Sequence, residues 1–251
     1  MTKPLSGRCV LVTGATGSIG RAIARQLSQD GARVVLHYAR SGDAARTLAS
    51  ELGEAIAIQA DLSTPDGPTA LWQEAEAKMG RLDALVNNAG QLTASSVEDA
   101  LNDWHRVWAS DIQLNLIAAA DLCRAAIGHF RSHGGGRIVN IASRAGQGGY
   151  RAEAMSYGAT KAALINLTQS IARGFGPDNI QAVAIAPGWV RTAMSDAYVA
   201  QHGAAAALAG IPVGRMAEAD EIAELVGFVL RPSQVSLSAA VLDVNGASQM
   251  R

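Results

Sequence analysis

The residues with the most direct chemical meaning in this chain are Tyr157 and Lys161, four positions apart, with Ser143 fourteen residues before the tyrosine. The pattern of residues 155–175 predicts a helix, so the tyrosine and the lysine share one face, about 6 Å apart along the axis. A lysine ammonium beside a phenol favours the phenolate and lowers a pKa that is ordinarily about 10. Such a phenol can exchange a proton with a carbonyl oxygen near neutral pH. Tyr-x-x-x-Lys is a common spacing, however, and a solvated lysine beside a half-buried tyrosine is the alternative.

The elements that must position these residues alternate between short apolar runs and helical patterns. Strands are predicted at residues 9–13, 33–37, 55–59, 82–86, 137–142, 180–185 and 239–244. Helices are predicted at residues 19–29, 43–52, 68–79, 104–130, 155–175 and 218–230. Strands separated by helices indicate right-handed crossovers, and therefore a doubly wound (Rossmann) parallel α/β sheet with helices on both faces.

The domain organisation follows from the absence of any linker-like stretch. No change of composition divides the 251 residues, so we expect one domain, 1–251, for dinucleotide binding and catalysis. Residues 191–216 have no strand pattern but contain short helical pieces at 194–201 and 204–208. A long excursion after a strand end is typical of an active-site lid, and we expect this segment to cover the substrate.

The bulk properties exclude several classes of protein. The chain is 49% hydrophobic and 17% charged, which is typical of a globular domain, and its net charge of −1 gives no indication of a nucleic-acid partner. Cys9 and Cys123 lie in apolar runs without neighbouring cysteine or histidine ligands, which predicts reduced core residues and no metal site. No apolar run approaches the length of a membrane span, and residues 1–7 lack the apolar core of a signal peptide. We therefore expect a cytoplasmic protein without a membrane segment.

A glycine-rich turn, Thr-Gly-Ala-Thr-Gly-Ser-Ile-Gly at residues 13–20, lies between the first predicted strand and the first helix. Glycines there let the chain turn tightly and let a pyrophosphate approach the N–H groups at the helix N-terminus. An ordinary glycine-rich turn is the alternative, but the place of this one between a strand and a helix favours cofactor binding. No lysine follows the glycines, so the P-loop pattern of nucleotidases is excluded.

With these pieces in place, the chain resembles the short-chain dehydrogenase/reductase family over nearly its whole length. The matching segments follow the family's order: residues 13–20, Asp61-Leu62, Asn-Asn-Ala-Gly at 87–90, Asn115, Ser143, Tyr157, Lys161 and Pro-Gly-Trp-Val-Arg-Thr at 187–192. Each falls at the C-terminal end of a predicted strand or on the next helix, where open α/β sheets bind ligands. One departure is Ser18, which stands where this branch of the family usually has glycine; its hydroxyl can itself donate to a phosphate.

The resemblance implies reversible hydride transfer between a nicotinamide and a carbonyl or secondary-alcohol carbon. Tyr157 is then the general acid/base, Lys161 its pKa-lowering partner, Ser143 the donor to the substrate oxygen, and Asn115 the residue whose backbone holds a relaying water. Without Tyr157, an ordinary turn serine would be the preferred interpretation of Ser143. The implied cofactor-binding residues are Gly14, Thr16, Gly17, Ser18, Ile19, Gly20, Arg40, Ser41, Asp61, Leu62, Asn88, Ala89, Gly90, Tyr157, Lys161, Pro187, Gly188, Val190 and Thr192.

The end of the second predicted strand indicates which nicotinamide cofactor is used. Enzymes that use NAD usually place an acid there for the ribose 2′-hydroxyl. This chain has Tyr38 at that position, followed by Arg40 and Ser41, which suit a 2′-phosphate. The stretch also looks like that of pteridine reductases, a subgroup that uses NADPH. We therefore expect NADP(H), with NAD(H) as the alternative; for Arg40 the alternative is a surface cation without a ligand.

The sequence leaves the substrate open beyond a small carbonyl or alcohol. Its register resembles 3-oxoacyl-carrier-protein reductases and, equally, many ketone and sugar reductases. The alternatives are a nucleotide-sensing regulator on the same fold, an NAD-dependent alcohol or sugar dehydrogenase, and a dehydratase or epimerase that acts through a bound NAD. The four catalytic residue types favour an enzyme over the regulator, and the short length without a C-terminal substrate domain argues against the dehydratase or epimerase. The resemblance also implies a homotetramer that pairs helices 104–130 and 155–175, with small residues for close packing at Ala125, Ala126, Ala159, Ala162 and Ala163.

Overall fold

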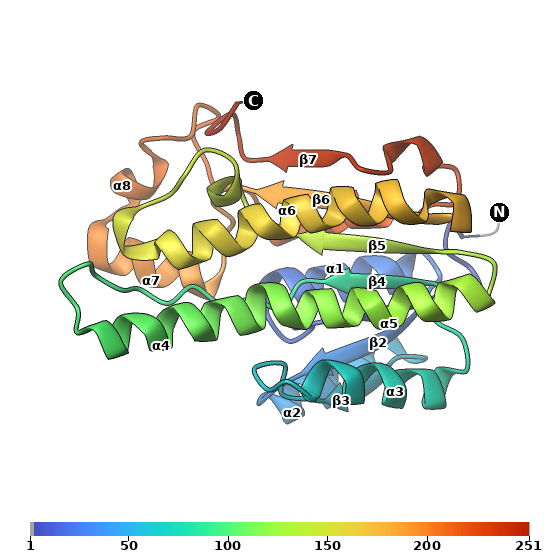
Figure 1. The fold of residues 1–251 in the computed structure, drawn as a ribbon. Coiled ribbons are helices and arrows are strands. Elements are labelled where there is room, and N and C mark those ends of the chain that lie inside the picture. The colour runs from blue at the N-terminus through green and yellow to red at the C-terminus, as the bar shows by residue number, and fades with distance from the viewer. Residues whose placement is uncertain (1–2, 251) are drawn as a thin grey trace.

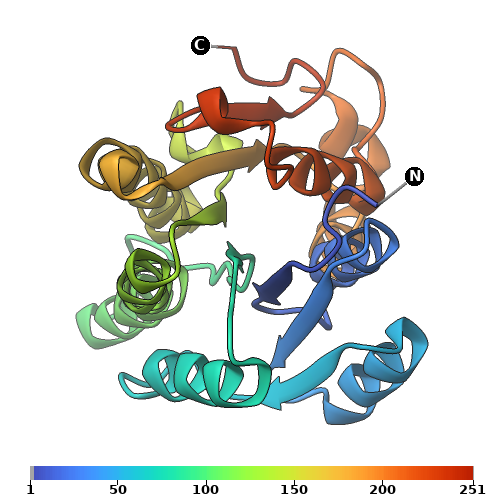
Figure 2. The same ribbon diagram turned by 90° about the vertical axis from the view of Figure 1, so that its right-hand side faces the viewer.

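A parallel sheet forms the centre of the computed structural model, which describes residues 3–250 (Figures 1 and 2). Its seven strands lie in the order β3-β2-β1-β4-β5-β6-β7. They are β1 Cys9–Val12, β2 Arg33–Tyr38, β3 Ile56–Gln59, β4 Ala84–Asn87, β5 Gly136–Ile141, β6 Ile180–Pro187 and β7 Val241–Val244. The chain winds outward from β1 to β3, crosses back to β4 and continues to β7. This confirms the doubly wound parallel sheet that the sequence predicts.

Helices cover both faces of the sheet, and each face has its own apolar core. One face carries α1 Ser18–Gln29, α2 Gly42–Leu52 and α9 Ala219–Val229; the other carries α3 Gly67–Met79, α5 Ala118–Ser132 and α6 Met155–Phe175. Successive strand residues point to opposite faces, so Val10 of β1 belongs to the first core and Leu11 to the second. Burial on both faces explains the unbroken apolar strands of the sequence.

The helix predicted at 104–130 is longer than expected and contains a break. It begins as α4 Leu101–Ile112, passes through a π-helical turn at Gln113–Ile117, and continues as α5 to Ser132. A π-helical turn accommodates an extra residue and displaces the local hydrogen bonds, often at a functional site. Apolar spacing alone does not reveal such a turn, which here surrounds Asn115.

The segment 191–216 contains two short helices, α7 Ala193–His202 and α8 Ala204–Leu208, beyond the carboxyl ends of the strands (Figure 1). Thr192 caps α7, because its side chain accepts from the Ser195 N–H while the Ser195 hydroxyl accepts from the Thr192 N–H. Ala207, Ile211 and Met216 form a separate small apolar cluster that Trp189 and Tyr198 join. The segment therefore packs largely on itself, apart from the two main cores.

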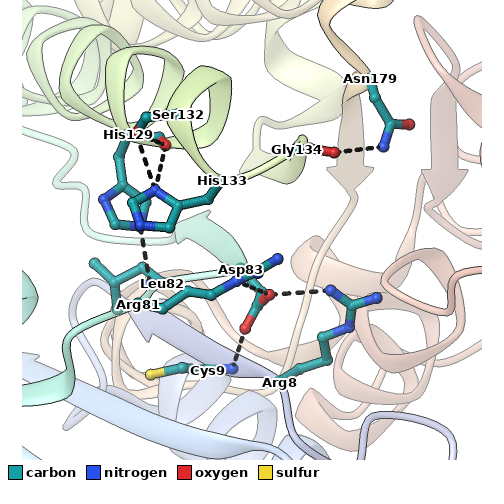
Figure 3. A network of polar contacts seen from close by, with 10 residues as sticks. All are labelled: Arg8, Cys9, Arg81, Leu82, Asp83, His129, Ser132, His133, Gly134 and Asn179. Carbon is teal, nitrogen blue, oxygen red and sulfur yellow. Dashed lines mark hydrogen bonds and ion pairs between the residues drawn. The ribbon is translucent and has the colours of Figure 1, made fainter.

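At the amino ends of the strands, Asp83, just before β4, holds β1 and β4 together (Figure 3). Its carboxylate accepts from Arg8 at 3.0 Å, from Arg81 at 2.9 Å and from the Cys9 N–H at 2.9 Å. At the same end of the sheet, His129 of α5 accepts from the Leu82 N–H at 3.1 Å. These contacts fix the starts of β1 and β4. The candidate catalytic and cofactor-binding residues lie at the opposite, carboxyl ends of the strands.

The two cysteines lie in the core, as the sequence predicts. Cys9 and Cys123 are both buried and free. Between residues 3 and 250, no helix is long and apolar enough to cross a membrane. Within that same range, no group of three or more His, Cys, Asp or Glu side chains is arranged to hold a metal ion.

Candidate active site

A cavity of about 1060 Å³ lies over the carboxyl ends of the strands. All the cofactor-binding residues that the sequence predicts line it, from the glycine turn at one end to Thr192 at the other. Ser143, Tyr157 and Lys161 line it as well, whereas Asn115 lies behind its wall. The fold thus brings together motifs that are spread over 180 residues of sequence.

The glycine turn between β1 and α1 fits a cofactor pyrophosphate. Gly14 has a φ of +62°, a left-handed conformation that favours glycine. A Cβ on Gly20 would lie 2.2 Å from the Gly14 carbonyl oxygen, so no larger residue fits there. No side chain caps the N-terminus of α1 at Gly17, so the first N–H groups of the helix remain available to an anion.

His37 of β2 holds this turn in place, a role that the sequence analysis did not assign. Its Nδ1 accepts from the Gly14 N–H at 3.0 Å, and its Nε2 lies 3.1 Å from the Ala60 carbonyl oxygen, which assigns the proton to Nε2. Burial lowers the pKa of His37 and favours this neutral form. A polar residue within an otherwise apolar buried strand was the sequence feature that pointed to it.

The ends of β1 and β4 are joined by Thr13 and Asn88. The Thr13 hydroxyl accepts from the N–H groups of Asn88 and Ala89, both at 2.9 Å. The Asn88 amide in turn donates to the carbonyl oxygens of Thr13, at 2.9 Å, and Gly14, at 3.2 Å. Its neighbour Asn87 points the other way and donates to Asn140 beneath the site, at 2.9 Å. Only Asn88 of the pair therefore faces the cavity.

Tyr157 and Ser143 meet at the end of β5, where the Ser143 side chain caps a short 3₁₀ helix, Arg144–Gly146. Burial raises the pKa of Tyr157 to about 12, and a hydrogen bond with Ser143 acts in the opposite direction. The lowered pKa that the sequence predicts for Tyr157 is therefore wrong for this structure. Burial opposes the phenolate more strongly than its neighbours favour it, so the phenol is held as a proton donor.

Lys161 lies one turn further along α6 and is buried. Its Nζ donates to the Ile141 carbonyl oxygen at 2.8 Å and lies 5.7 Å from the centre of the Tyr157 ring. Burial lowers the pKa of Lys161 to about 8. The same desolvation thus shifts the two pKa values in opposite directions, because it disfavours the charged form of each group.

Asn115 anchors the loop that follows β4. Its side chain accepts from the Gln91 N–H at 2.8 Å and donates to the Gln91 carbonyl oxygen at 2.9 Å and to the Thr160 hydroxyl at 3.2 Å. A Cβ on Gly90 would lie 3.1 Å from the Asn115 Oδ1 and 3.4 Å from the Lys161 Nζ. Asn115 therefore adjoins the lysine without lining the cavity itself.

Asp111 is a second residue that the sequence analysis missed. It is fully buried, and its carboxylate accepts from Ser156 at 2.7 Å and from Thr93 at 3.0 Å. These bonds tie α4 to the first turn of α6, directly before Tyr157, and its negative charge contributes to the raised pKa of the tyrosine. An acid one helical turn before Asn115 was the only sequence feature that marked it.

The adenosine end of the cavity is lined by residues after β2 and β3. The Asp61 carboxylate accepts from the N–H and the hydroxyl of Ser63, at 2.9 and 2.6 Å, and these bonds lower its pKa, with a smaller contribution from Arg40. Arg40 is exposed and forms no ion pair with any of the described residues. Its guanidinium is therefore free to meet a ligand.

Comparison with known proteins agrees with this geometry. The sequence pattern of short chain dehydrogenases matches residues 8–203. Nodulation protein G of Rhizobium sp. (strain N33) is 36% identical, and the cis-4-hydroxycyclohexanecarboxylate dehydrogenase of Sinomonas cyclohexanicum is 35% identical, each match covering 98% of both chains. A 3-oxoacyl-[acyl-carrier-protein] reductase of Synechocystis sp. is 34% identical over the same shares.

A solved structure shows the same fold. A short chain dehydrogenase from Burkholderia cenocepacia J2315, in complex with NADP, superposes with a TM-score of 0.86 at 33% identity, covering 98% of this chain and 99% of the other. Motif order, strand topology and full-length similarity all lead to one conclusion. The chain belongs to the short-chain dehydrogenase/reductase family.

Proposed function

We propose that this protein is an NADP(H)-dependent oxidoreductase that interconverts a carbonyl and a secondary alcohol, with Tyr157 as general acid/base. The observation that carries the proposal is the convergence of Ser143, Tyr157 and Lys161 on the wall of the cavity that begins at the glycine turn. A regulator that only senses nucleotides would have no need of a buried lysine beside a half-buried phenol that faces the cavity.

In the direction of reduction, the bound cofactor supplies the hydride to the carbonyl carbon. The Ser143 hydroxyl donates to the substrate oxygen as negative charge develops on it. Tyr157 then transfers its phenolic proton to that oxygen, a step for which its raised pKa keeps it in the acid form. Lys161 stabilises the phenolate that remains, and Asn115 positions the segment from which a new proton reaches the lysine.

The proposed preference for NADP(H) rests on Arg40 and Ser41, which line the cavity where a ribose 2′-phosphate would lie. The NADP complex of the B. cenocepacia relative supports this choice. Asp61 and Asn88 are proposed to contact the adenosine, and Val190 and Thr192 the nicotinamide carboxamide. The glycine turn, with its uncapped helix N-terminus, is proposed to bind the pyrophosphate.

The substrate is proposed to bind between Tyr157 and segment 191–216, which would act as its lid. Tyr150, Trp189 and Met194 line this end of the cavity and offer apolar contacts. The names of two relatives, a 3-oxoacyl-carrier-protein reductase and a hydroxycyclohexanecarboxylate dehydrogenase, point to linear and cyclic ketones as the two classes to examine.

The test is a panel of substrates followed by the absorbance of the reduced cofactor. Linear 3-oxoacyl thioesters, 4-oxocyclohexanecarboxylate and the corresponding alcohols would each be mixed with NADPH or NADP⁺, and in parallel with NADH or NAD⁺. We expect turnover of at least one ketone with NADPH, and its loss in Tyr157→Phe. Tight NADPH binding without turnover of any member, by the parent enzyme, would support the nucleotide-sensing alternative instead.

A further inference from the structure

The substrate end of the cavity contains a guanidinium that the proposed chemistry does not use. Arg144 follows Ser143 directly in the chain and lines the cavity together with Tyr150 and Tyr157. Proton transfer, oxyanion stabilisation and phenolate stabilisation are already assigned to Tyr157, Ser143 and Lys161. A further cation at this place therefore needs another explanation.

The backbone of Arg144 is held against the helix that carries the catalytic groups. It begins the 3₁₀ helix Arg144–Gly146, which packs against α6. A Cβ on Gly146 would lie 2.5 Å from the Ala162 nitrogen, so the two backbones are in direct contact. Ala162 is next to Lys161, and the contact therefore links Arg144 to the helix that carries both Lys161 and Tyr157. A group bound by Arg144 would be held in a defined relation to the reacting oxygen.

The Arg144 guanidinium has few hydrogen-bond partners among the described residues. It is half-buried, and its one hydrogen bond among the described residues is long, 3.4 Å from its Nη1 to the Ser248 carbonyl oxygen. Arg25, also half-buried, and the exposed Arg215 each have a glutamate partner, at 2.7 and 2.6 Å. A guanidinium that is partly removed from water without a carboxylate partner is costly, and an anionic ligand would remove that cost.

The charges around the substrate end favour an anion. The charged residues that line the cavity are Arg40, Asp61, Arg144 and Lys161, and the first two lie at the adenosine end. The catalytic end is therefore lined by two cations and no carboxylate. The nearby Asp111 is fully buried, and its oxygens accept from Ser156 and Thr93.

Arg151 packs behind this wall without lining the cavity itself. Arg151 lies 5.2 Å from the centre of the Tyr150 ring and 6.0 Å from that of Trp189, the two aromatic residues that line the substrate end. It pairs with the exposed Glu153 at 3.3 Å, so these two charges offset each other. The wall thus combines apolar rings with the Arg144 guanidinium, a combination that suits an organic anion.

We propose that Arg144 determines specificity by pairing with a carboxylate on the substrate, so that the natural substrate is a ketone or alcohol with an apolar body and a free carboxylate. A single planar guanidinium matches a carboxylate in charge and in bidentate geometry. This inference rests on the proposed oxidoreductase function, because it concerns the substrate of the same site.

Matched ketones test the proposal by kinetics. The probes are 4-oxocyclohexanecarboxylate and its methyl ester, reduced with NADPH by the parent, Arg144→Gln, Arg144→Lys and the surface control Arg33→Gln. We expect the parent to prefer the acid, and Arg144→Gln to lower kcat/KM for the acid about tenfold to a hundredfold, mainly through KM. The ester should change less than about threefold, Arg144→Lys should recover part of the loss, and Arg33→Gln should match the parent. Equal losses for acid and ester in Arg144→Gln, or a parent that prefers the ester, would overturn the proposal.

A binding experiment separates this proposal from the proposed function. Cyclohexanecarboxylate and cyclohexanecarboxamide would be titrated calorimetrically into the enzyme saturated with NADP⁺, which keeps the carboxylate out of the cofactor's own phosphate positions. We expect the carboxylate to bind more tightly than the amide, and Arg144→Gln to remove the difference. If this pattern is found without turnover of any ketone, the carboxylate site stands and the oxidoreductase function fails. If turnover is found but carboxylate and amide bind alike, the function stands and the role of Arg144 is rejected.

Discussion

Asn115 holds the backbone of Gln91 at both of its polar groups, accepting from the N–H at 2.8 Å and donating to the carbonyl oxygen at 2.9 Å. A side-chain amide is the only group of this size that can both accept and donate in this way. The π-helical turn that contains Asn115 brings the amide to the loop after β4. This pairing fixes Gly90, which in turn adjoins Lys161.

We predict that Asn115→Asp impairs catalysis by breaking half of this pairing. The carboxylate can still accept from the Gln91 N–H, but it cannot donate to the Gln91 carbonyl oxygen or to Thr160. Losing a buried donor leaves acceptors unsatisfied, at a cost of about 1–3 kcal/mol in stability. Denaturant unfolding and steady-state kinetics would measure both effects, with the exposed Asn102→Asp as the control. Unchanged stability and activity in Asn115→Asp would show that the pairing is dispensable.

We predict that Tyr157→Phe abolishes turnover and retains cofactor binding. The change removes the acid/base hydroxyl and keeps the ring, and general acid catalysis contributes about a hundredfold to ten-thousandfold. The affinity for NADPH, followed by cofactor fluorescence, should stay within a few-fold of the parent. A variant that retains turnover within a few-fold of the parent would exclude Tyr157 as the proton donor.

The buried ammonium of Lys161 should make stability depend on pH. The pKa of Lys161 is about 8 in the folded chain, against 10.5 for an unperturbed lysine, so the unfolded chain binds more protons between these values. Stability therefore rises with pH across this window, and the cost of the buried charge is fully present below pH 8. Lys161→Met removes this dependence. We expect the unfolding free energy of Lys161→Met to exceed that of the parent by most near pH 7. This difference should shrink by up to about 3 kcal/mol toward pH 10.5.

Guanidinium unfolding at pH 7, 8.5 and 10 would measure this trend. Lys78→Met is the matched control, because Lys78 is half exposed and pairs with Glu74 on the surface of α3. The control should track the parent at every pH. A Lys161→Met curve that stays parallel to that of the parent would mean that burial does not lower the lysine pKa.

We predict that Arg40→Ala weakens NADPH binding and leaves NADH binding nearly unchanged. A charge-assisted pair with a phosphate contributes about 1.5–3 kcal/mol, or roughly tenfold to a hundredfold in affinity, and NADH has no 2′-phosphate. Calorimetric titration of both cofactors would show the difference. Arg25→Ala, which removes an exposed arginine paired with Glu51, should change neither affinity. Equal losses for both cofactors in Arg40→Ala would reject the proposed contact.

We predict that the protein is a homotetramer that buries exposed residues of α4 and α6. Ala159 and Ala162 are exposed on α6, and Ile112 and Leu101 expose 36% and 66% of their surface on α4. Ala126, by contrast, is fully buried in the core and cannot contact another subunit, so its expected interface role is wrong. Ala162→Arg should reduce the mass measured by light scattering, whereas Lys78→Met should not. A parent that is monomeric at micromolar concentration would exclude the assembly.

The sequence alone determined the parallel sheet, the approximate positions of the helices that cover it, and many of the residues that line the cavity. These features depend on local patterns: apolar runs bounded by glycines, helical spacing, and motifs that stand at the ends of strands. Because parallel strands bring their carboxyl ends to one edge, the order of Thr13, Asn88, Ser143 and Tyr157 along the chain was enough to place them together.

Only the tertiary structure decided the properties that depend on neighbours distant in sequence. The pKa of Tyr157 is raised because burial, together with Tyr150 and Asp111, outweighs the hydrogen bond with Ser143. The tie between His37 and Gly14, and the orientations of Asn87 and Asn88, depend on contacts between strands that no local pattern encodes. Desolvation and hydrogen-bond partners depend on the folded environment as a whole, so residue spacing along the chain cannot predict them.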